Sequence, residues 1–329
     1  MGTDTQFCAV CRQALDEGCH SALVVPIFKS EEHIKHVFAY AERIASGVPG
    51  GVHLVFVDDG SPDGAVREVR RIAQDSILKV SLVRLSRNFG VGPAVHAGLA
   101  AVDGCATVVF GSDLQEPHEL FINFLTKILR GEADVCLGQR TSRDDPFMMR
   151  LFASLYWWIN RKFMQNDTPR GGFDVFGLAR PARLALVELG ELNTSLTSQL
   201  QWIGFRREYI PYVRRARLSG KSTWTMRRKF KLFADSIYGF TGAPIALLFV
   251  VGVVAVGALG IFSMTTFVGW SLGWIDLAGY TTIVLLLAVG QAVNLLALGI
   301  LGGYLYRTFD NSKGRPRYIA SSIELLRSE

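Results

Sequence analysis

The sequence lacks several features that would assign the protein to a familiar class. The first twenty of its 329 residues contain no apolar run, so we expect no secretory signal peptide. No internal repeat and no low-complexity segment is visible. The segment NFGVGPAVHAG has Gly90 and Gly92, but Val95 stands where a dinucleotide-binding loop needs its third glycine. A NAD-dependent dehydrogenase is therefore not expected.

Cysteine is scarce, with five residues in the whole chain. Cys105 and Cys136 lie in apolar, strand-like runs, so we interpret them as core residues of a protein in a reducing compartment. The other three cysteines form a short cluster with a histidine: Cys8, Cys11, Cys19 and His20. This cluster is a candidate zinc site, but adjacent Cys and His ligands suit a tetrahedral site poorly. We favour an N-terminal extension over residues 1–20.

Charge is absent from two long runs near the C-terminal end. Residues 243–268 and 279–305 contain no charged side chain, and each exceeds the ~20 residues that cross a bilayer core. They predict two transmembrane helices, with buried core helices as the alternative. The flanks at 227–231 and 307–317 carry four basic residues each, whereas the connector between the runs holds only Asp276. Because basic flanks face the cytoplasm, we expect a multi-pass protein of the inner (plasma) membrane with both termini cytoplasmic.

Acidic residues are nearly absent from 206–231, which has ten basic residues and one acid, Glu208. The segment is therefore +9, and the rest of the chain, at +6 overall, is −3. A basic block beside a membrane span predicts contact with anionic headgroups or a phosphate substrate rather than with nucleic acid. Helical spacing predicts basic amphipathic helices at 147–163 and 224–240, lying in the membrane interface. For the first of these, packing onto the soluble domain is an equal alternative.

The remaining sequence alternates short apolar runs with helical patterns. Strands are predicted at 22–28, 52–61 (where the strand is followed by a turn), 78–86, 106–113 and, as the last, 133–140; helices are predicted at 31–46, 64–75, 92–102 and 117–130. Such alternation indicates an α/β fold with a mostly parallel, doubly wound sheet, in which ligands bind beyond the carboxyl ends of the strands. The polar residues that fall at those ends are Asp58, Asp59, Asp113, Gln115 and Arg140.

Two of these strand ends carry candidate ligand groups. In VDDGSPDG, residues 57–64, Asp58 and Asp59 are placed to accept hydrogen bonds from a base or from ribose hydroxyls. The alternative is local: Ser61 or Asp63 caps the next helix, and Asp59 stabilises the turn.

The second strand end, GSDLQEP, places oxygen ligands for a hard cation. Asp113 and Gln115 suit Mg²⁺ or Mn²⁺, which commonly use one or two protein groups together with substrate phosphates. A diphosphate leaving group requires such an ion to neutralise its developing charge. The alternative is that Asp113 only caps the helix that begins near Pro117.

Taken together, these residues resemble the polyprenyl-phosphate glycosyltransferases of glycosyltransferase family 2, the dolichyl-phosphate mannose synthase-like group. The resemblance covers residues ~21–325. Its motifs, in order, are VVPIFKSEEHI, FVDDGSPDGA, LSRNFGVGPAVHAGL, GSDLQEP, GQR, GGFDVFGLAR, WIGFRREYIPYVRRARLSGKSTW and LGGYLYRTFDNSKGRPRYI. It implies a GT-A fold, a Rossmann-like mixed sheet that is mostly parallel, followed by interfacial helices and two transmembrane helices.

The resemblance also implies a role for particular residues. The implied nucleotide-binding residues are Pro26, Asp58, Asp59, Arg87, Asn88 and Ser112. Asp113 and Gln115 would hold the divalent ion. Acceptor-phosphate contacts would come from Arg140, Arg150, Ser154, Arg214, Arg215, Arg217 and Lys221, since arginine clamps position and partly neutralise a phosphate. Within these sets, the catalytic group would be Asp113, Arg140, Arg150 and Ser154.

The implied activity is an inverting transfer of a sugar from a nucleotide sugar to a polyprenyl phosphate, giving a lipid-linked sugar for glycan or cell-envelope modification. The expected domains are an extension at 1–20, a cytoplasmic catalytic domain at 21–220, a juxtamembrane helix at 221–242, a transmembrane domain at 243–308 and a cytoplasmic tail at 309–329. Gln291 and Asn294 lie on one face of the second span, and we interpret them as contacts within or between subunits, with a lipid path as the alternative; a homo-oligomer is one expectation.

The sequence departs from the family pattern at the predicted site. Gly111 stands where the first acid of a D-x-D motif is usual, Lys29 where an asparagine is usual, and Asp174 where an arginine is usual. Lys221 is displaced by two positions. These changes support an alternative, a degenerate protein that binds a nucleotide sugar without turnover and partners a flippase. A processive synthase is disfavoured because QLQWIG lacks the arginine of its Q-x-x-R-W motif.

Overall fold

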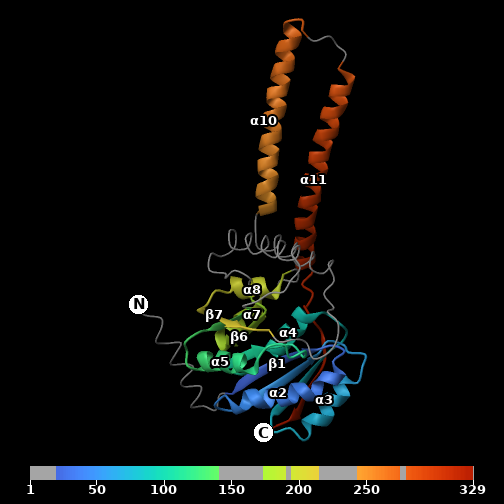
Figure 1. Cartoon of the computed structure of the whole chain (residues 1–329). Helices are drawn as coiled ribbons and strands as arrows, with labels where there is room; N and C mark the ends of the chain where they lie inside the picture. The colour runs from blue at the N-terminus through green and yellow to red at the C-terminus, as the bar shows by residue number, and fades with distance from the viewer. Residues whose placement is uncertain (1–19, 141–172, 190–193, 215–242, 275–278, 329) are drawn as a thin grey trace. The chain divides into compact units, whose positions relative to one another are not determined.

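A computed structural model describes residues 20–140, 173–189, 194–214, 243–274 and 279–328. The chain divides into two compact units (Figure 1). The first contains Met1–Glu191, Ser195–Thr225 and Pro316–Glu329, and the second contains Leu192–Thr194 and Met226–Arg315. Several predicted features lie outside the described residues: the Cys8, Cys11 and Cys19 cluster, the helices at 147–163 and 224–240, and the site residues Arg150, Ser154, Arg215, Arg217 and Lys221.

The described part of the first unit is built on one eight-stranded sheet in the order β7-β5-β6-β4-β1-β2-β3-β8. The strands are β1 (Ser21–Ile27), β2 (Val52–Asp58), β3 (Lys79–Leu85), β4 (Ala106–Val109), β5 (Val135–Arg140), β6 (Val175–Ala179), β7 (Arg207–Tyr212) and β8 (Ala320–Arg327). The neighbours β4-β1-β2-β3 and the pair β5-β7 are parallel, whereas β6 and β8 pair antiparallel. The predicted mixed, mostly parallel α/β sheet is confirmed.

Helices cover both faces of the sheet (Figure 1). They are η1 (Glu31–His33), α2 (Ile34–Ser46), α3 (Ala65–Ala73), α4 (Val91–Ala100), α5 (His118–Leu129), α7 (Arg180–Glu188) and α8 (Leu196–Trp202). One buried cluster packs α2, α3 and α5 on the face that carries Leu23 and Phe56, and the other packs α4, α7 and α8 on the face that carries Val24 and Val55. Because both faces are covered, the central strands are continuous apolar runs without alternation.

The prediction that 133–140 is the last strand is wrong, because β6, β7 and β8 follow it. The strand β8 comes after the second apolar helix and pairs antiparallel with β3, so that Val83 lies opposite Ile323. Residues Ala320–Arg327, expected in a separate tail, therefore form an edge of the sheet. Strand pairing across more than two hundred residues leaves no local signal in the sequence.

Cys105 is a core residue, as interpreted, but it is not a free thiol. It is buried, at 5% exposure, immediately before β4, but the structure records it as disulfide-bonded. Cys136 in β5 is a free, buried thiol, as expected. Since disulfides are uncommon in reducing compartments, Cys105 does not support the compartment inferred from cysteine usage.

The second unit contains two long helices, α10 (Ala243–Ser271) and α11 (Tyr280–Ser312). Within them, Val250–Ser271 and Gly290–Ser312 are long and apolar enough to cross a membrane. Large apolar side chains on both helices are exposed, such as Ile261 at 70% and Leu287 at 67%. Exposed apolar surface on this scale marks a region that contacts a membrane or another protein.

Candidate functional site: the carboxyl edge of the sheet

The predicted residues at the ends of β1, β2 and β4 meet at one edge of the sheet. The backbone N–H of Asp59 donates to the Ile27 carbonyl over 3.0 Å, and that of Phe110 donates to the Val24 carbonyl over 3.2 Å. These bonds continue the two parallel ladders past the ends of the strands. They bring the loops after β1, β2 and β4 together, as expected for neighbouring parallel strands.

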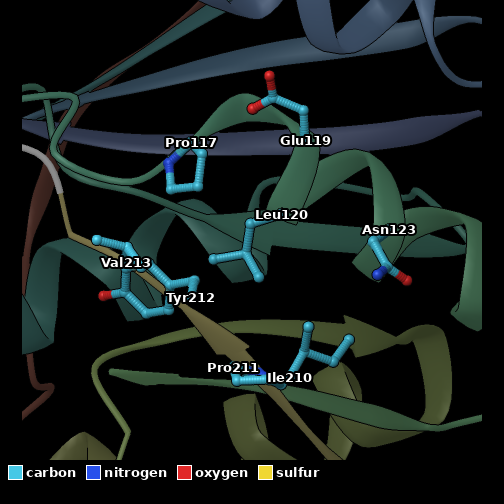
Figure 2. A pocket seen from close by; sticks show the side chains of 8 residues that line it. All are labelled: Pro117, Glu119, Leu120, Asn123, Ile210, Pro211, Tyr212 and Val213. Carbon is cyan, nitrogen blue, oxygen red and sulfur yellow. The ribbon is translucent and has the colours of Figure 1, made fainter. Parts of the chain in front are cut away.

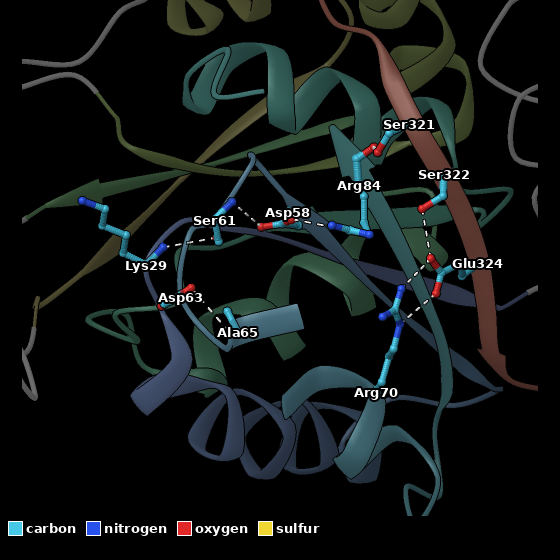
Figure 3. A network of polar contacts seen from close by, with 10 residues as sticks. All are labelled: Lys29, Asp58, Ser61, Asp63, Ala65, Arg70, Arg84, Ser321, Ser322 and Glu324. Atoms are coloured by element: carbon cyan, nitrogen blue, oxygen red, sulfur yellow. Dashed lines mark hydrogen bonds and ion pairs between the residues drawn. The ribbon is translucent and has the colours of Figure 1, made fainter. Parts of the chain in front are cut away.

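Asp58 ends β2 and is almost completely buried. Its side chain is 2% exposed; one oxygen accepts the Ser61 N–H over 2.9 Å and the other lies 3.8 Å from Arg84 Nε (Figure 3). The sequence placed Asp58 at this edge correctly. Both carboxylate oxygens face protein groups, so Asp58 fixes the start of the loop and the orientation of Arg84 on β3.

Asp59 holds the next loop by its backbone. Its two oxygens accept the N–H groups of Phe89 (2.7 Å) and Gly90 (2.9 Å), and the residue is 4% exposed. Burial raises the pKa of Asp59 above its usual value, although the two amides act in the opposite direction. These contacts agree with the alternative that Asp59 stabilises a turn. The turn, however, belongs to the loop at 87–90 and not to the segment that follows Asp59.

Replacing Asp59 by alanine is expected to destabilise the protein by about 2–4 kcal/mol, because two partly buried N–H groups would lose their acceptor. Thermal unfolding of the full-length protein in detergent would measure the change. Asp75→Ala, at an exposed acid just after α3, is the matched control and should shift stability by less than about 0.5 kcal/mol. An Asp59→Ala protein as stable as the control would contradict the anchoring role.

The loop after β2 lies directly against the loop that carries Arg87 and Asn88. Gly60 has φ +68°, and a Cβ there would approach the Arg87 carbonyl carbon to 2.8 Å and the Asn88 nitrogen to 2.9 Å. Only glycine fits both the conformation and the space. The side chains of Arg87 and Asn88 are exposed, and the Arg87 guanidinium lies 4.1 Å from the centre of the Phe89 ring. Both predicted residues are thus accessible to a ligand at this edge.

The loop after β1 links the Asp58 loop to the Asp113 loop. The backbone N–H of Lys29 donates to Ser61 Oγ over 3.3 Å (Figure 3), and Ser30 Oγ lies 3.0 Å from Ser112 Oγ. Pro26, another predicted nucleotide contact, is half-buried near the end of β1. The nucleotide and metal motifs, predicted separately from the sequence, are therefore joined by a short chain of hydroxyl contacts.

The loop after β4 turns tightly at Gly111–Leu114. The Leu114 N–H donates to the Gly111 carbonyl over 3.3 Å, and Leu114 has φ +48°, which is uncommon for a residue with a side chain. Asp113 is half-buried and Gln115 is 7% exposed. A Cβ at Gly111 would lie 2.8 Å from Asp113 Oδ1. The Asp113 carboxylate therefore occupies the space that a side chain at position 111 would need.

The donor set at this turn suits a divalent ion only with help from substrate. Asp113 would supply one carboxylate and Gln115 one amide oxygen. Among the described residues, no group of three or more His, Cys, Asp or Glu side chains is placed to hold a metal. Mg²⁺ commonly binds through one or two protein oxygens and completes its shell with phosphates and water. The turn therefore fits an ion that arrives with, or is completed by, a diphosphate.

A second polar cluster, which the sequence did not reveal, lies at the ends of β5 and β7 and the start of β6. Arg140 pairs in register with Tyr212, and the Asp174 N–H donates to the Gly138 carbonyl. The Arg140 guanidinium forms an ion pair with the Asp174 carboxylate, which also accepts the Tyr212 hydroxyl over 2.6 Å. Burial and the neighbouring Asp174 raise the pKa of the Tyr212 hydroxyl, so it stays a donor.

The contacts in this cluster change the interpretation of Arg140 and Asp174. Arg140 lies at the carboxyl edge, as predicted, but in this structure its charge is already paired. Asp174, noted from the sequence only as a departure from the family pattern, is the partner. The exchange of an arginine for an acid at 174 therefore comes with an internal ion pair, which an acceptor phosphate would have to share or displace.

Glu116 is a further buried acid that the sequence did not single out. It is 4% exposed, its Oε1 lies 3.8 Å from Arg214 Nε, and its carbonyl accepts the Tyr40 hydroxyl over 2.8 Å. Burial, followed by the charges of Asp113 and Asp174, raises the pKa of Glu116 to about 7. The contact places Arg214, predicted to face the acceptor phosphate, beside the loop that carries the metal motif.

A pocket of about 440 Å³ lies beside this second cluster, between the first turns of α5 and strand β7 (Figure 2). Its lining residues are Pro117, Glu119, Leu120, Asn123, Ile210, Pro211, Tyr212 and Val213. Tyr212 is the residue shared by the pocket and the Asp174 contact. None of the residues predicted to bind nucleotide or metal lines it.

The C-terminal strand reaches the back of the Asp58 loop. Ser321 Oγ donates to the Arg84 carbonyl over 3.1 Å, and Glu324 forms a two-pronged ion pair with Arg70, with distances of 2.8 and 3.0 Å (Figure 3). Arg84 is thus held between Asp58 and β8. Further along the same segment, Arg317 contacts the side chains of His96 and Gln199.

Comparison with known proteins agrees with this architecture. The family model described as glycosyl transferase family 2 matches residues 22–189. The chain is 29% identical to the putative glycosyltransferase CsbB of Bacillus subtilis, over 92% of each protein. It is 27% identical to the bactoprenol glucosyl transferase of Shigella phage SfV, over 91% of this chain and 97% of that one. Among solved structures, glucosyl-3-phosphoglycerate synthase of Mycobacterium tuberculosis matches with a TM-score of 0.46 and 20% identity, covering 68% of this chain and 80% of that one.

Proposed function

Because the chain belongs to glycosyl transferase family 2, we propose that it transfers a sugar from a nucleotide sugar to a polyprenyl phosphate at the cytoplasmic face of a membrane. The observation that carries the proposal is coverage: the bactoprenol glucosyl transferase of phage SfV aligns along 91% of this chain. The alignment therefore extends beyond the catalytic sheet and includes the region of the two apolar helices. The mixed sheet is the GT-A-like fold of the family.

The proposed reaction is a single displacement with inversion. A phosphate oxygen of the lipid attacks the anomeric carbon, the bond from that carbon to the donor diphosphate breaks, and the nucleoside diphosphate leaves with the bonding electrons. A phosphate monoester is already anionic near neutral pH, with a second pKa of about 6, so a general base is less necessary than for an alcohol. The protein contributes alignment and electrostatic stabilisation.

Different residues of the carboxyl edge would bind the nucleotide, the metal ion and the acceptor phosphate. Arg87 and Asn88 are exposed on the loop that Asp59 anchors and would contact the nucleotide. Asp113 and Gln115 would hold Mg²⁺ or Mn²⁺, which neutralises charge on the departing diphosphate when bound. Arg140 and Arg214 would face the acceptor phosphate, with Arg140 exchanging part of its contact with Asp174 for that phosphate.

The membrane part of the proposal rests on α10 and α11. Both are long and apolar enough to cross a bilayer, and basic residues flank the pair on the side away from the connector. A two-span protein with cytoplasmic termini would keep the catalytic sheet on the side where nucleotide sugars are made. A homo-oligomer stays a prediction.

The test uses the purified full-length protein in detergent with undecaprenyl phosphate and a panel of radiolabelled nucleotide sugars. Each reaction would run with Mg²⁺, with Mn²⁺ or with EDTA, and the label extracted into butanol would be counted. Label in the lipid phase that EDTA lowers would support the transferase and identify its donor. Binding of nucleoside diphosphate without transfer from any donor would instead support the degenerate, non-catalytic protein.

A further inference from the structure

The metal turn after β4 is poor in negative charge, although a diphosphate must be neutralised there. It has one carboxylate, from Asp113, and the position two residues earlier is Gly111. The Asp113 Oδ1 atom occupies the space into which a side chain at 111 would extend, at 2.8 Å from the ideal Cβ. A divalent ion held by so few protein oxygens binds weakly, because each charged ligand adds to affinity. A further positive charge is therefore needed to neutralise the departing diphosphate.

A lysine stands at the neighbouring strand end. The strands β1 and β4 are adjacent and parallel; Lys29 lies two residues after the end of β1, and Ser112 lies three residues after the end of β4. The contact of 3.0 Å between Ser30 Oγ and Ser112 Oγ ties the two loops together one residue from Lys29 and one residue from Asp113. The backbone of Lys29 therefore lies beside the turn that carries the metal motif.

The backbone of Lys29 is fixed in an uncommon conformation. Its φ is +53°, in the left-handed region that lysine seldom adopts. Its N–H donates to Ser61 Oγ, and the Ser61 N–H in turn donates to Asp58, so the loop is tied to the nucleotide motif as well. Strain of this kind is retained where the surrounding structure dictates the conformation, and it is concentrated at functional sites.

The side chain of Lys29 is exposed and extends away from Ser61 and Asp58 (Figure 3). Among the residues that the structure describes, its ammonium has no carboxylate partner, and its recorded contact is the Phe28 ring, 5.5 Å away. The basic groups Arg140 and Arg214 of the same edge, in contrast, are each paired with an acid. Lys29 is thus a cation at the carboxyl edge of the sheet that has no carboxylate partner among the described residues.

We infer that Lys29 binds the diphosphate of the nucleotide donor and shares with the divalent ion the neutralisation of the leaving group. This inference rests on the proposed function, since it assigns a residue to that same donor site. The lysine stays protonated throughout. As the bond between the anomeric carbon and the diphosphate oxygen breaks, the electron pair stays on the diphosphate, and the adjacent ammonium stabilises the charge. Because part of the charge is met by the protein, diphosphate binding should persist when the metal is removed.

The experiment is isothermal titration calorimetry of the full-length protein in detergent with UDP and with GDP, in EDTA and in Mn²⁺. Lys29→Met should weaken binding of the preferred diphosphate about tenfold in EDTA and less in Mn²⁺, while the affinity for the corresponding nucleoside stays unchanged. Lys29→Asn removes the same charge and suits the positive φ better, so it should fold at least as well and show the same loss. Lys35→Met, at an exposed lysine of α2, is the matched control and should bind like the wild type.

The outcomes separate this inference from the function on which it rests. Wild-type binding that both Lys29 variants retain in EDTA would overturn the role of the lysine and leave the transferase proposal standing. An equal loss of affinity for the nucleoside and for the diphosphate would also overturn it, because the defect would then concern the loop and not a charge on the diphosphate. A wild-type protein that binds neither diphosphate, with or without Mn²⁺, would overturn both proposals.

Discussion

Replacing Asp113 by asparagine should lower the rate of sugar transfer by about 10³-fold, which corresponds to ~4 kcal/mol of transition-state stabilisation. The substitution keeps the size of the side chain and removes the one carboxylate of the turn between Gly111 and Gln115. In a site with a second acid, the remaining carboxylate would still bind the ion, and the rate of transfer would fall less. Here the remaining donor, Gln115, is uncharged, so binding of the ion and neutralisation of the diphosphate should both suffer.

The same butanol-extraction assay would measure this effect, with the donor identified for the wild type. Asp103→Asn is the matched control, because Asp103 is an exposed acid that precedes β4, whereas Asp113 follows it. The control should retain activity within about twofold. Nucleoside-diphosphate affinity in EDTA should be nearly unchanged in Asp113→Asn if Lys29 carries metal-free binding. Full activity of Asp113→Asn would exclude the proposed metal site.

Removing the C-terminal segment 316–329 should destabilise the first unit severely, although the segment follows both apolar helices. The deletion exposes the edge of β3, breaks the ladder from Val80 to Leu85, and removes the ion pair of Glu324 with Arg70. Each lost intramolecular hydrogen bond costs ~1 kcal/mol, and the deletion removes several of them, so the total is a large share of a typical domain stability of ~5–15 kcal/mol. We expect a much lower unfolding temperature and aggregation through the new edge.

A pair of point substitutions tests the same strand without deleting it. Leu326 packs against the core of the sheet, whereas its neighbour Leu325 points outward and is 58% exposed. Because successive side chains of a strand face opposite sides, Leu326→Asp should cost about 2–5 kcal/mol and Leu325→Asp should cost little. Thermal unfolding of both full-length variants would measure the difference. Equal stabilities would mean that β8 does not pair in this register.

Much of the carboxyl edge of the sheet followed from local patterns. The runs that became β1 to β5 are apolar and short, and the polar residues after them were expected to meet because parallel strands point the same way. Asp58, Asp59, Asp113 and Arg140 all lie where that argument put them. The two apolar helices followed from composition alone, since a run without charge that exceeds twenty residues has few other structures open to it.

The partners of these residues did not follow from local patterns. Asp59 was expected to serve a nucleotide or its own turn, but it holds the amides of Phe89 and Gly90, thirty residues away. The pair of Arg140 with Asp174 depends on β6 running antiparallel beside β5, and the burial of Glu116 depends on the packing of α5 against the sheet. Each is a contact between segments that the sequence keeps apart.

The sequence by itself determined which residues lie at strand ends, which runs are apolar enough for a bilayer, and which motifs match a glycosyltransferase, because period, hydropathy and motif spacing are local properties. Only the tertiary structure decided that β8 closes the edge of β3, that Asp174 neutralises Arg140, and that Lys29, beside the Asp113 turn, has no carboxylate partner among the described residues. Strand order and charge pairing are set by which surfaces bury together. Which surfaces are buried together depends on the whole chain, so strand order and charge pairing cannot be predicted from a short segment.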